Sequence, residues 1–327
     1  MRTPASGRRL SVALSMILLW GILGRAEPQT PPSIAGQDPA PFKIAVNVDL
    51  VVLQPTVRDH KGRFVSDLRE QDFQVYEDGV RQSIRLFKHE DVPVTVGLVI
   101  DHSGSMWTKL NEVIAAARTF VRSSNREDEM FVVNFNEHVT LGLPPEERFS
   151  NRADELQAAI LKVQATGETA LYDAVAEALD LVHAGAREKK VLIVISDGGD
   201  NASIHSLAEV LKMAELSNTL VYTVGIFTPQ DADQNPGVLR RFAQATGGEA
   251  FLPEELDDVV PICERIAHDI RNQYTIGYFS SNAVKPGVFR TIRVVATGTA
   301  DRKLSVRARS GYIAGGGQAP VKLESAK

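Results

Sequence analysis

The stretch Thr95-Val-Gly-Leu-Val-Ile-Asp-His-Ser-Gly-Ser-Met106 decides the fold of this chain. Its first half belongs to an apolar run with no polar face, which is typical of a strand that is covered on both sides of a sheet. Its second half places Asp101, Ser103 and Ser105 where strand becomes loop. Ligands of open α/β sheets bind at the carboxyl ends of strands, and three oxygen side chains suit a hard divalent cation. The same residues could instead cap the turn and the next helix.

Alternating strand and helix patterns follow this stretch. Further strands are expected over 130–135, 191–195, 220–227 and 249–252. Helices are expected over 110–121, 154–163, 169–182, 238–245 and 255–271, and another that ends at 216 and is capped by Ser203 or Ser206. Strands that alternate with helices at this spacing indicate a doubly wound, mostly parallel sheet with helices on both faces. Cys263, the only cysteine, falls on the apolar stripe of the last helix and is expected to be a small buried hydrophobe.

The sequence on either side of the α/β part has the two-residue period of β-strands. Asp78-Gly79 is a strong hairpin signal between strand 73–77 and a returning strand at Ile84–Phe87. Later strands are expected over 273–279, 289–296 and 304–312. Neither flank has enough strands to bury two faces alone. We therefore expect one small β-sandwich-like domain with halves at 43–91 and 273–314, into which the α/β domain at 92–272 is inserted.

The amino terminus has the three parts of a secretory signal peptide. Basic residues precede the apolar run Leu10–Leu23, and small residues precede an expected cut after Ala26. The run is shorter than the ~20 residues that span a bilayer. Residues 1–26 are therefore predicted to be a signal peptide, 27–42 a proline-rich linker and 315–327 a disordered tail. The protein is expected to be exported, periplasmic or extracellular, and not held in the membrane after cleavage.

The charge of the chain is balanced. The 327 residues, enough for about two domains, include 36 Lys and Arg and 41 Asp and Glu, for a net charge of −5. No long basic run lies beyond the amino terminus, so nothing favours a nucleic-acid partner.

Two more loops carry oxygen side chains to the same edge of the expected sheet. Thr169 opens a helix, and Asp197 follows the strand 191–195. Each has an ordinary explanation, because Thr is a common helix cap and Asp often precedes Gly in turns. Three such loops at one edge are harder to explain by chance than any one of them.

These residues carry a resemblance to a known family. Asp101-His-Ser-Gly-Ser-Met106, Thr169-Ala-Leu-Tyr-Asp-Ala174 and Ile195-Ser-Asp-Gly198 resemble the three-part motif of von Willebrand factor type A (VWA) domains, over about residues 92–272. The resemblance implies a metal-ion-dependent adhesion site (MIDAS), with one divalent cation and an Asp or Glu carboxylate of a protein partner. The metal is usually magnesium, sometimes manganese or calcium. The residues implied are Asp101, Ser103, Ser105, Thr169 and Asp197.

One position departs from the family, since Glu168 stands where Gly is frequent; the Glu168 carboxylate would add charge to the site or face solvent.

The flanks Asp67–Gly79 and Gln273–Tyr278 are similar to VWFA-related exported proteins common in acidobacteria, a group defined mostly by sequence. Because the metal loops are expected at the surface, Asp101→Ala is expected to remove the metal and leave the fold largely intact.

Three classes of function stay open. The leading hypothesis is an exported protein-binding module without catalytic residues. A metal-dependent hydrolase would use the cation as a Lewis acid and need a base nearby; His102 is the only histidine beside the motif, and it is expected to point to solvent. A scaffold would use the metal only to hold loops. The sequence leaves the metal, the partner, the oligomeric state, the export route and any movement of the final helix undecided.

Overall fold

The computed structural model describes residues 50–227, 233–282, 286–298 and 303–315, which all belong to one compact unit, Asn47–Lys327. The predicted signal peptide and linker, the start of the first β-segment and the tail beyond Gly315 lie outside the described residues. Within the described ranges, no helix is long and apolar enough to span a bilayer.

The α/β part is built on a six-stranded sheet in the order β11-β10-β9-β6-β7-β8. All eight residues of β6 are buried, as expected of a strand that is covered on both sides. The pairings are parallel except that of β8 with β7. The predicted doubly wound, mostly parallel sheet is therefore confirmed. Its strands are β6 (Val94–Asp101), β7 (Glu129–Phe135), β8 (Val139–Leu141), β9 (Lys189–Ser196), β10 (Leu220–Gly225) and β11 (Ala250–Phe251).

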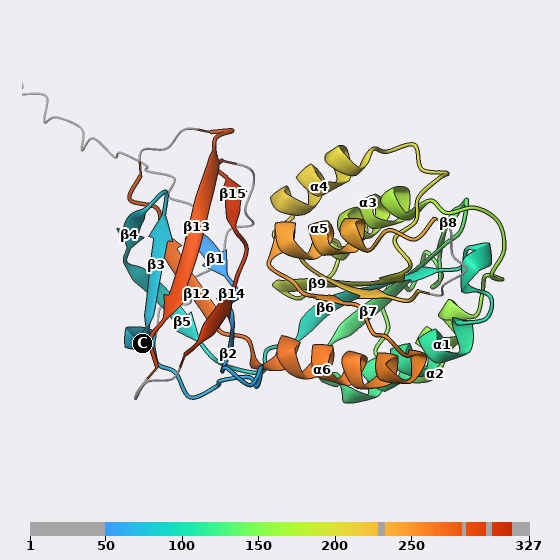
Figure 1. Cartoon of the computed structure of the whole chain (residues 1–327), viewed down its shortest axis with the longest axis horizontal. Helices are drawn as coiled ribbons and strands as arrows, with labels where there is room; N and C mark the ends of the chain where they lie inside the picture. Colours follow the sequence, from blue (N-terminus) through green and yellow to red (C-terminus); the bar gives the residue numbers. More distant parts are fainter. Residues whose placement is uncertain (1–49, 228–232, 283–285, 299–302, 316–327) are drawn as a thin grey trace, which may run out of the picture. The chain divides into compact units, whose positions relative to one another are not determined.

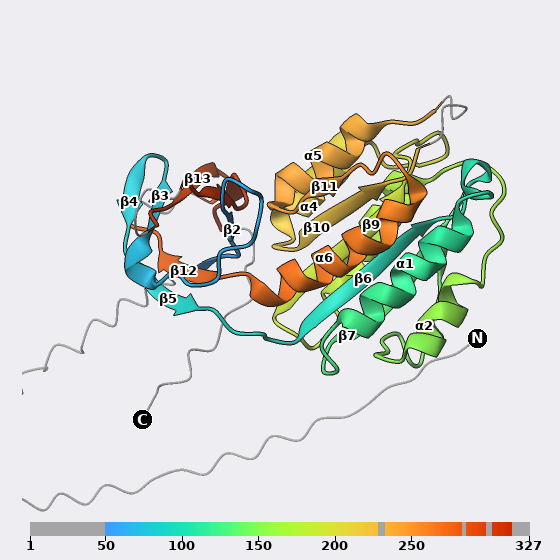
Figure 2. The same cartoon turned by 60° about the horizontal axis from the view of Figure 1, so that its bottom comes forward.

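Helices cover both faces of this sheet (Figure 1). One face packs against α1 (Leu110–Ser123), α2 (Ala153–Ile160) and α6 (Val259–Asn272). The other packs against α3 (Leu171–Val182), α4 (Leu207–Leu216) and α5 (Pro236–Thr246). Figure 2 shows α1 and α6 lying side by side along β6. Each helix turns an apolar stripe to the sheet; Cys263 is buried in the stripe of α6, as predicted.

A glycine at the centre of β6 has a packing reason. A Cβ atom at Gly97 would overlap the ring of Phe131 on β7 and the side chain of Leu192 on β9. Gly97 therefore lets two large side chains of neighbouring strands cross over the central strand, which is a recurrent reason for Gly inside a strand.

The two flanks form antiparallel sheets together, as predicted. The sheet orders are β1-β12-β5, β15-β13-β3-β4 and β14-β2, and each sheet takes strands from both flanks. Their apolar side chains share one core. The domain boundaries at 91/92 and 272/273 stay a prediction. The strands are β1 (Leu50–Leu53), β2 (Thr56–Arg58), β3 (Phe73–Glu77), β4 (Val80–Gln82), β5 (Ile84–Lys88), β12 (Thr275–Phe279), β13 (Phe289–Ala296), β14 (Ser305–Arg307) and β15 (Gly311–Ile313).

Two strand predictions are wrong. The strand that returns from the hairpin is β4, directly after the turn, because Asp78 and Gly79 both have positive φ and bring Glu77 into pairing with Val80. The segment Ile84–Lys88, which was expected to be the returning strand, belongs to another sheet, where it pairs with β12. The expected strand 304–312 is two strands, of which β14 pairs with β2 and β15 with β13. A short polar interruption sends the chain from one sheet to another, and alternation along the sequence does not reveal it.

A buried carboxylate joins two of these sheets. Glu77 on β3 has no exposed area. It accepts hydrogen bonds from the Tyr278 hydroxyl of β12 at 2.8 Å and the Tyr312 hydroxyl of β15 at 2.9 Å. Ser280 Oγ and Asn282 Nδ2 donate to it as well. Burial raises the pKa of Glu77, but these hydrogen bonds outweigh burial and hold that pKa below its ordinary value.

Polar contacts also link the antiparallel sheets to the α/β part. Arg58 on β2 pairs with Asp269 of α6, which is 1% exposed, and with Glu249 at 3.2 Å. Gln273 Nε2 donates to the hydroxyl of Tyr222 at 2.8 Å and to that of Thr56 at 3.1 Å. Helix α6 is thus anchored at its carboxyl end by buried polar groups from both parts.

Candidate metal centre

The predicted site residues come from three loops at one edge of the six-stranded sheet. Asp101 is the last residue of β6, and Asp197 directly follows β9. Because β6 and β9 are adjacent and parallel, their carboxyl ends lie together. Thr169 lies two residues before α3. A short 3-10 helix, Gly104–Met106, carries Ser105 out of the first loop.

Hydrogen bonds and one close contact between hydroxyl oxygens connect four of the five predicted residues. Ser103 Oγ lies 3.2 Å from Ser105 Oγ, and Ser105 Oγ donates to Asp197 Oδ2 at 2.6 Å. The amide of Ser103 donates to Asp101 Oδ1 at 2.8 Å. The structure therefore brings Asp101, Ser103, Ser105 and Asp197 into one oxygen cluster.

Thr169 is tied through its backbone to the loop that follows Asp197, and not to the oxygen cluster itself. Its carbonyl accepts from the amides of Asn201 and Ala202, in the loop that follows Asp197. Its own amide donates to Asn201 Oδ1 at 2.8 Å. Among the described residues, its hydroxyl makes no hydrogen bond with the other four. Thr169 is 8% exposed, at the mouth of the site.

Asp101 itself is fully buried, although the loop that follows it reaches the surface, as expected, at Gly104 and Trp107. The loop closes over it because Gly104 N donates to Gly167 O and holds the second loop against the first. Burial and the nearby Asp197 raise the pKa of Asp101 to about 6. Two neighbouring carboxylates beside neutral hydroxyls are a donor set that fits a hard divalent cation.

His102 is also buried, which corrects the prediction that it points to solvent. Even-numbered residues of β6 face the helices α1 and α2, and His102 continues that alternation. Its Nε2 lies 3.1 Å from Asn134 Oδ1, and Asn134 Nδ2 donates to the carbonyl of Ala159. Burial lowers the pKa of His102. The imidazole is therefore part of the packing beneath the loop and faces away from solvent.

Sequence reasoning missed the residues that orient the cluster. Ser196 Oγ donates to Asp101 Oδ2 at 2.6 Å and accepts from the amide of Gly198 at 2.9 Å. Asp173 accepts the amides of Ile204 and His205, each at 2.9 Å, and ties the third loop to α3. Both residues stand inside the motif segments quoted above, so their positions were visible although no role was assigned to them.

Gly198 and Glu168 complete the loops. Gly198 has φ +81°, and a Cβ there would overlap the carbonyl of Asn235, so the turn after Asp197 requires glycine. Glu168 is exposed, and its amide donates to Glu137 Oε2 at 3.1 Å. Two places were expected for the Glu168 carboxylate, beside the metal or facing solvent. The structure shows the second.

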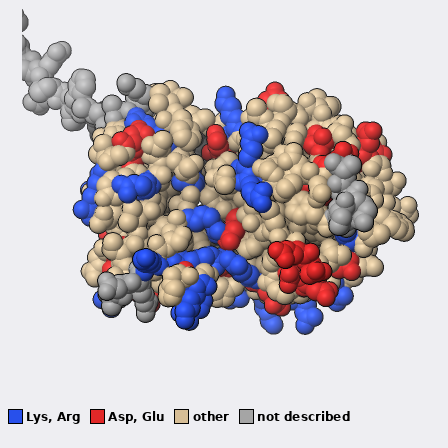
Figure 3. All heavy atoms as spheres, viewed as in Figure 1, with Lys and Arg blue, Asp and Glu red and all other residues tan. Residues whose placement is uncertain are grey.

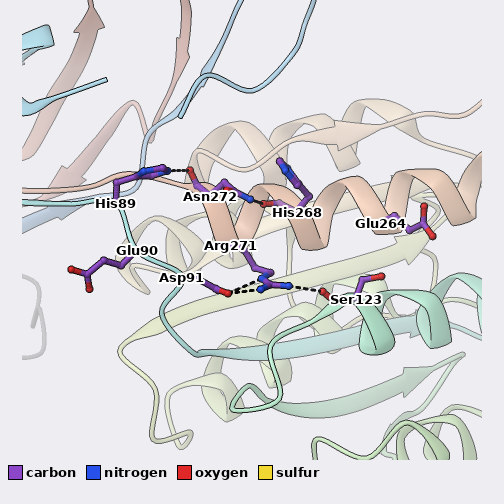
Figure 4. A pocket seen from close by; sticks show the side chains of 8 residues that line it. All are labelled: His89, Glu90, Asp91, Ser123, Glu264, His268, Arg271 and Asn272. Atoms are coloured by element: carbon purple, nitrogen blue, oxygen red, sulfur yellow. Dashed lines mark hydrogen bonds and ion pairs between the residues drawn. The ribbon is translucent and has the colours of Figure 1, made fainter. Parts of the chain in front are cut away.

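A hollow of about 520 Å³ lies away from this site, between the connection that precedes β6 and helix α6 (Figure 4). Part of its polar lining already has partners. His89 Nε2 contacts the carbonyl of Asn272, and Arg271 pairs with Asp91. In the part of the chain that the structure describes, no group of three or more His, Cys, Asp and Glu could hold a metal ion. We assign no ligand to this hollow.

Comparison with known proteins agrees with the fold and the motif. The sequence profile of the von Willebrand factor type A domain matches residues 95–261, which are 167 of the 327 residues. Inter-alpha-trypsin inhibitor heavy chain H2 of Mus musculus is 23% identical over 231 residues, which cover 64% of this chain and 24% of that protein. The chain thus spans about a quarter of the length of this relative.

Solved structures show similar folds at low identity. A von Willebrand factor type A protein from Catenulispora acidiphila is 14% identical with a TM-score of 0.48, over 82% of this chain and 75% of that one. Proximal thread matrix protein 1 from the mussel byssus, solved with a zinc-occupied MIDAS motif, is 17% identical with a TM-score of 0.46. The match covers 59% of this chain and 49% of that one. The narrower resemblance to acidobacterial proteins stays a prediction. By the profile match over half of its length, the chain belongs to the von Willebrand factor type A domain family.

Proposed function

We propose that this chain is an exported module that binds a protein partner through one divalent cation held by Asp101, Ser103, Ser105, Thr169 and Asp197. VWA domains are known for metal-dependent protein–protein interaction, which supports the general class. The observation that carries the proposal is the oxygen cluster, in which Ser105 Oγ lies 3.2 Å from Ser103 Oγ and 2.6 Å from Asp197 Oδ2. Such closely spaced oxygens of mixed charge suit magnesium best, with manganese or calcium as alternatives.

The chain's own residues are arranged to hold and orient these oxygens. Ser196 and the amide of Ser103 fix both oxygens of Asp101, and such outer contacts set the direction of metal ligands. A bound cation supplies the positive charge that accepts a partner's Asp or Glu. The remaining ligands are neutral hydroxyls, so the negative charge of the chain's two carboxylates does not exceed the positive charge of the cation. The cation can therefore still attract a carboxylate of the partner.

A catalytic role has less support than binding. A hydrolase would need a base beside the metal, and the histidine next to the motif is buried against Asn134. We therefore propose no catalytic residue.

Calorimetric titration of magnesium, manganese, calcium and zinc into the full chain tests the site; zinc is included because the mussel protein was solved with it. We expect uptake of one ion per chain. If none of the four binds at millimolar concentration, the adhesion-type proposal is wrong and a scaffold without metal is the better explanation. Retention of partners from the native exported fraction, with and without chelator, tests the second half of the proposal.

Thr169→Ala is expected to weaken metal binding by at least roughly tenfold, the smallest effect of losing even an outer partner of a metal, and by less than a change at the charged ligand Asp101. It removes a neutral oxygen that makes no hydrogen bond with the rest of the cluster, while the backbone bonds of residue 169 remain. The same titration measures it. A loss as complete as that caused by a change at Asp101 would mean that Thr169 does more than supply one neutral ligand.

The mature chain is expected to begin near Glu27, because a charged segment, an apolar run and small residues precede it. Amino-terminal sequencing of the protein recovered from the native host measures this. A mature chain that still begins at Met1 or Arg2 would indicate an uncleaved anchor instead.

A further inference from the structure

Large apolar side chains stand exposed on two of the three loops that form the candidate metal centre. Trp107, two residues after Ser105, is 69% exposed, and Ile204, on the loop after Asp197, is 94% exposed. Exposed tryptophan and isoleucine have no role in the core of the α/β part. Trp in particular is enriched among residues that dominate binding energy at protein interfaces.

Ile204 is held in place rather than carried on a free loop. Its amide and that of His205 both donate to the carboxylate of Asp173 on α3. Asp200, on the same loop, accepts the hydroxyl of Ser203 and the amide of Tyr172. Trp107 follows the short helix Gly104–Met106, and its amide donates to the carbonyl of Gly104. A backbone held in this way loses little freedom on binding, which favours affinity.

The opposite side of the site is acidic. Glu137 follows β7 and Glu168 lies in the second loop; both are exposed, and the amide of Glu168 donates to Glu137 Oε2. In the sheet, β7 and β9 lie on opposite sides of β6, so Glu137, which follows β7, and Ile204, on the loop after β9, lie on different sides of the site. Segments 101–108, 136–138, 163–170 and 197–206 hold five carboxylates and no Lys or Arg. Figure 3 shows further Asp and Glu gathered over the α/β part on the visible face.

We infer that the partner presents its metal-binding Asp or Glu on a protein loop that also carries a large apolar side chain and a Lys or Arg. The apolar side chain would contact Trp107 or Ile204, and the basic one would pair with Glu137 and Glu168. This inference rests on the proposed function. It adds which side chains must stand beside the partner's carboxylate for the site to select it. A bound divalent cation leaves these four segments with excess negative charge, so a partner with carboxylates alone would be repelled.

Disulfide-closed peptide loops with a fixed central Asp and randomised neighbours are the probe. They are displayed on yeast and selected against the full chain in millimolar magnesium. We expect enrichment of Trp, Phe, Leu or Ile on one side of the Asp and of Lys or Arg on the other. Binding of a selected loop should fall about tenfold or more in Trp107→Ala and clearly in Ile204→Ser. The double variant Glu137→Gln, Glu168→Gln should weaken binding and reduce its dependence on salt.

Controls separate this inference from the proposal on which it rests. Leu216→Ala and Glu146→Gln change exposed residues outside these four segments and should bind selected loops as wild type does. All variants should keep the magnesium affinity of wild type. Selected loops that require magnesium but bind equally well to the Trp107 and Ile204 variants would overturn the inference and leave the proposed function intact. Loops that bind in chelator would overturn the proposed function itself. Failure to enrich any loop, with magnesium still bound, would overturn the partner inference.

Discussion

Asp101→Asn is expected to abolish magnesium binding while the chain stays folded. Asp101 is the more deeply buried of the two carboxylates of the cluster, and it is oriented by Ser103 and Ser196. Its loss should exceed the roughly 10–100-fold effect of losing an outer partner of a metal. Asn keeps the size of the side chain and an oxygen that can accept from Ser103. It is therefore a better test than Asp101→Ala, which would open a gap beneath the loop.

The stability of the metal-free variant gives a second readout. Burial and Asp197 already disfavour the ionised form of Asp101, so a neutral Asn should leave the melting temperature of the metal-free chain unchanged or raised. Magnesium should raise the melting temperature of wild type, since a ligand that binds only the folded state stabilises it. It should not raise that of Asp101→Asn.

Asp180→Asn is the matched control, because it makes the same chemical change at an exposed position of α3. It should bind magnesium as wild type does. Undiminished magnesium uptake by Asp101→Asn would show that the metal, if any, is held elsewhere.

Glu77→Ala is expected to destabilise the β-domain by about 3 kcal/mol or more, because it leaves several buried donors without their acceptor. The donors include the hydroxyls of Tyr278 and Tyr312, which come from two different sheets. A loss of this size lowers the melting temperature by roughly 12–24 °C in domains of 60–100 residues, the size class of this β-domain. Thermal and urea unfolding measure it, and Glu77→Gln, which keeps one acceptor oxygen, should lose less.

The effect of Glu77 should depend on pH in a defined direction. Its pKa is held below the ordinary value of 4.5 in the folded chain. A carboxylate with a lowered folded pKa stabilises the fold above its unfolded pKa, and that contribution disappears as the pH falls through the folded pKa. The difference in unfolding free energy between wild type and Glu77→Gln should therefore be full at neutral pH and shrink well below pH 4.5.

Glu70→Ala, at an exposed position on the same flank, is the control and should change stability little. If Glu77→Ala unfolds at the same temperature as wild type, the buried cluster does not hold the two sheets together.

The apolar run of β6 and its polar end predicted much of the α/β part correctly. A strand without a polar face can only be buried on both sides, and helical stripes between strands leave few other arrangements. The edge where the oxygen residues meet follows from the same argument, because parallel neighbouring strands end together. The register of the flanks was less predictable. Asp78-Gly79 predicted the turn but not that the short strand β4 follows it directly. The break between β14 and β15 does not interrupt the alternation of apolar and polar residues, so it could not be predicted from the sequence.

The sequence by itself determined which residue types are available for a metal and at which edge of a parallel sheet they stand. Only the tertiary structure decided that Asp101 and His102 are buried and that Ser196 and Asp173 orient the loops. It alone placed Glu77 within reach of Tyr278 and Tyr312, residues more than 200 positions away. The physical reason is that burial and hydrogen bonding across distant segments depend on which loop packs over which strand end. That packing is a property of the whole core and has no local period in the sequence.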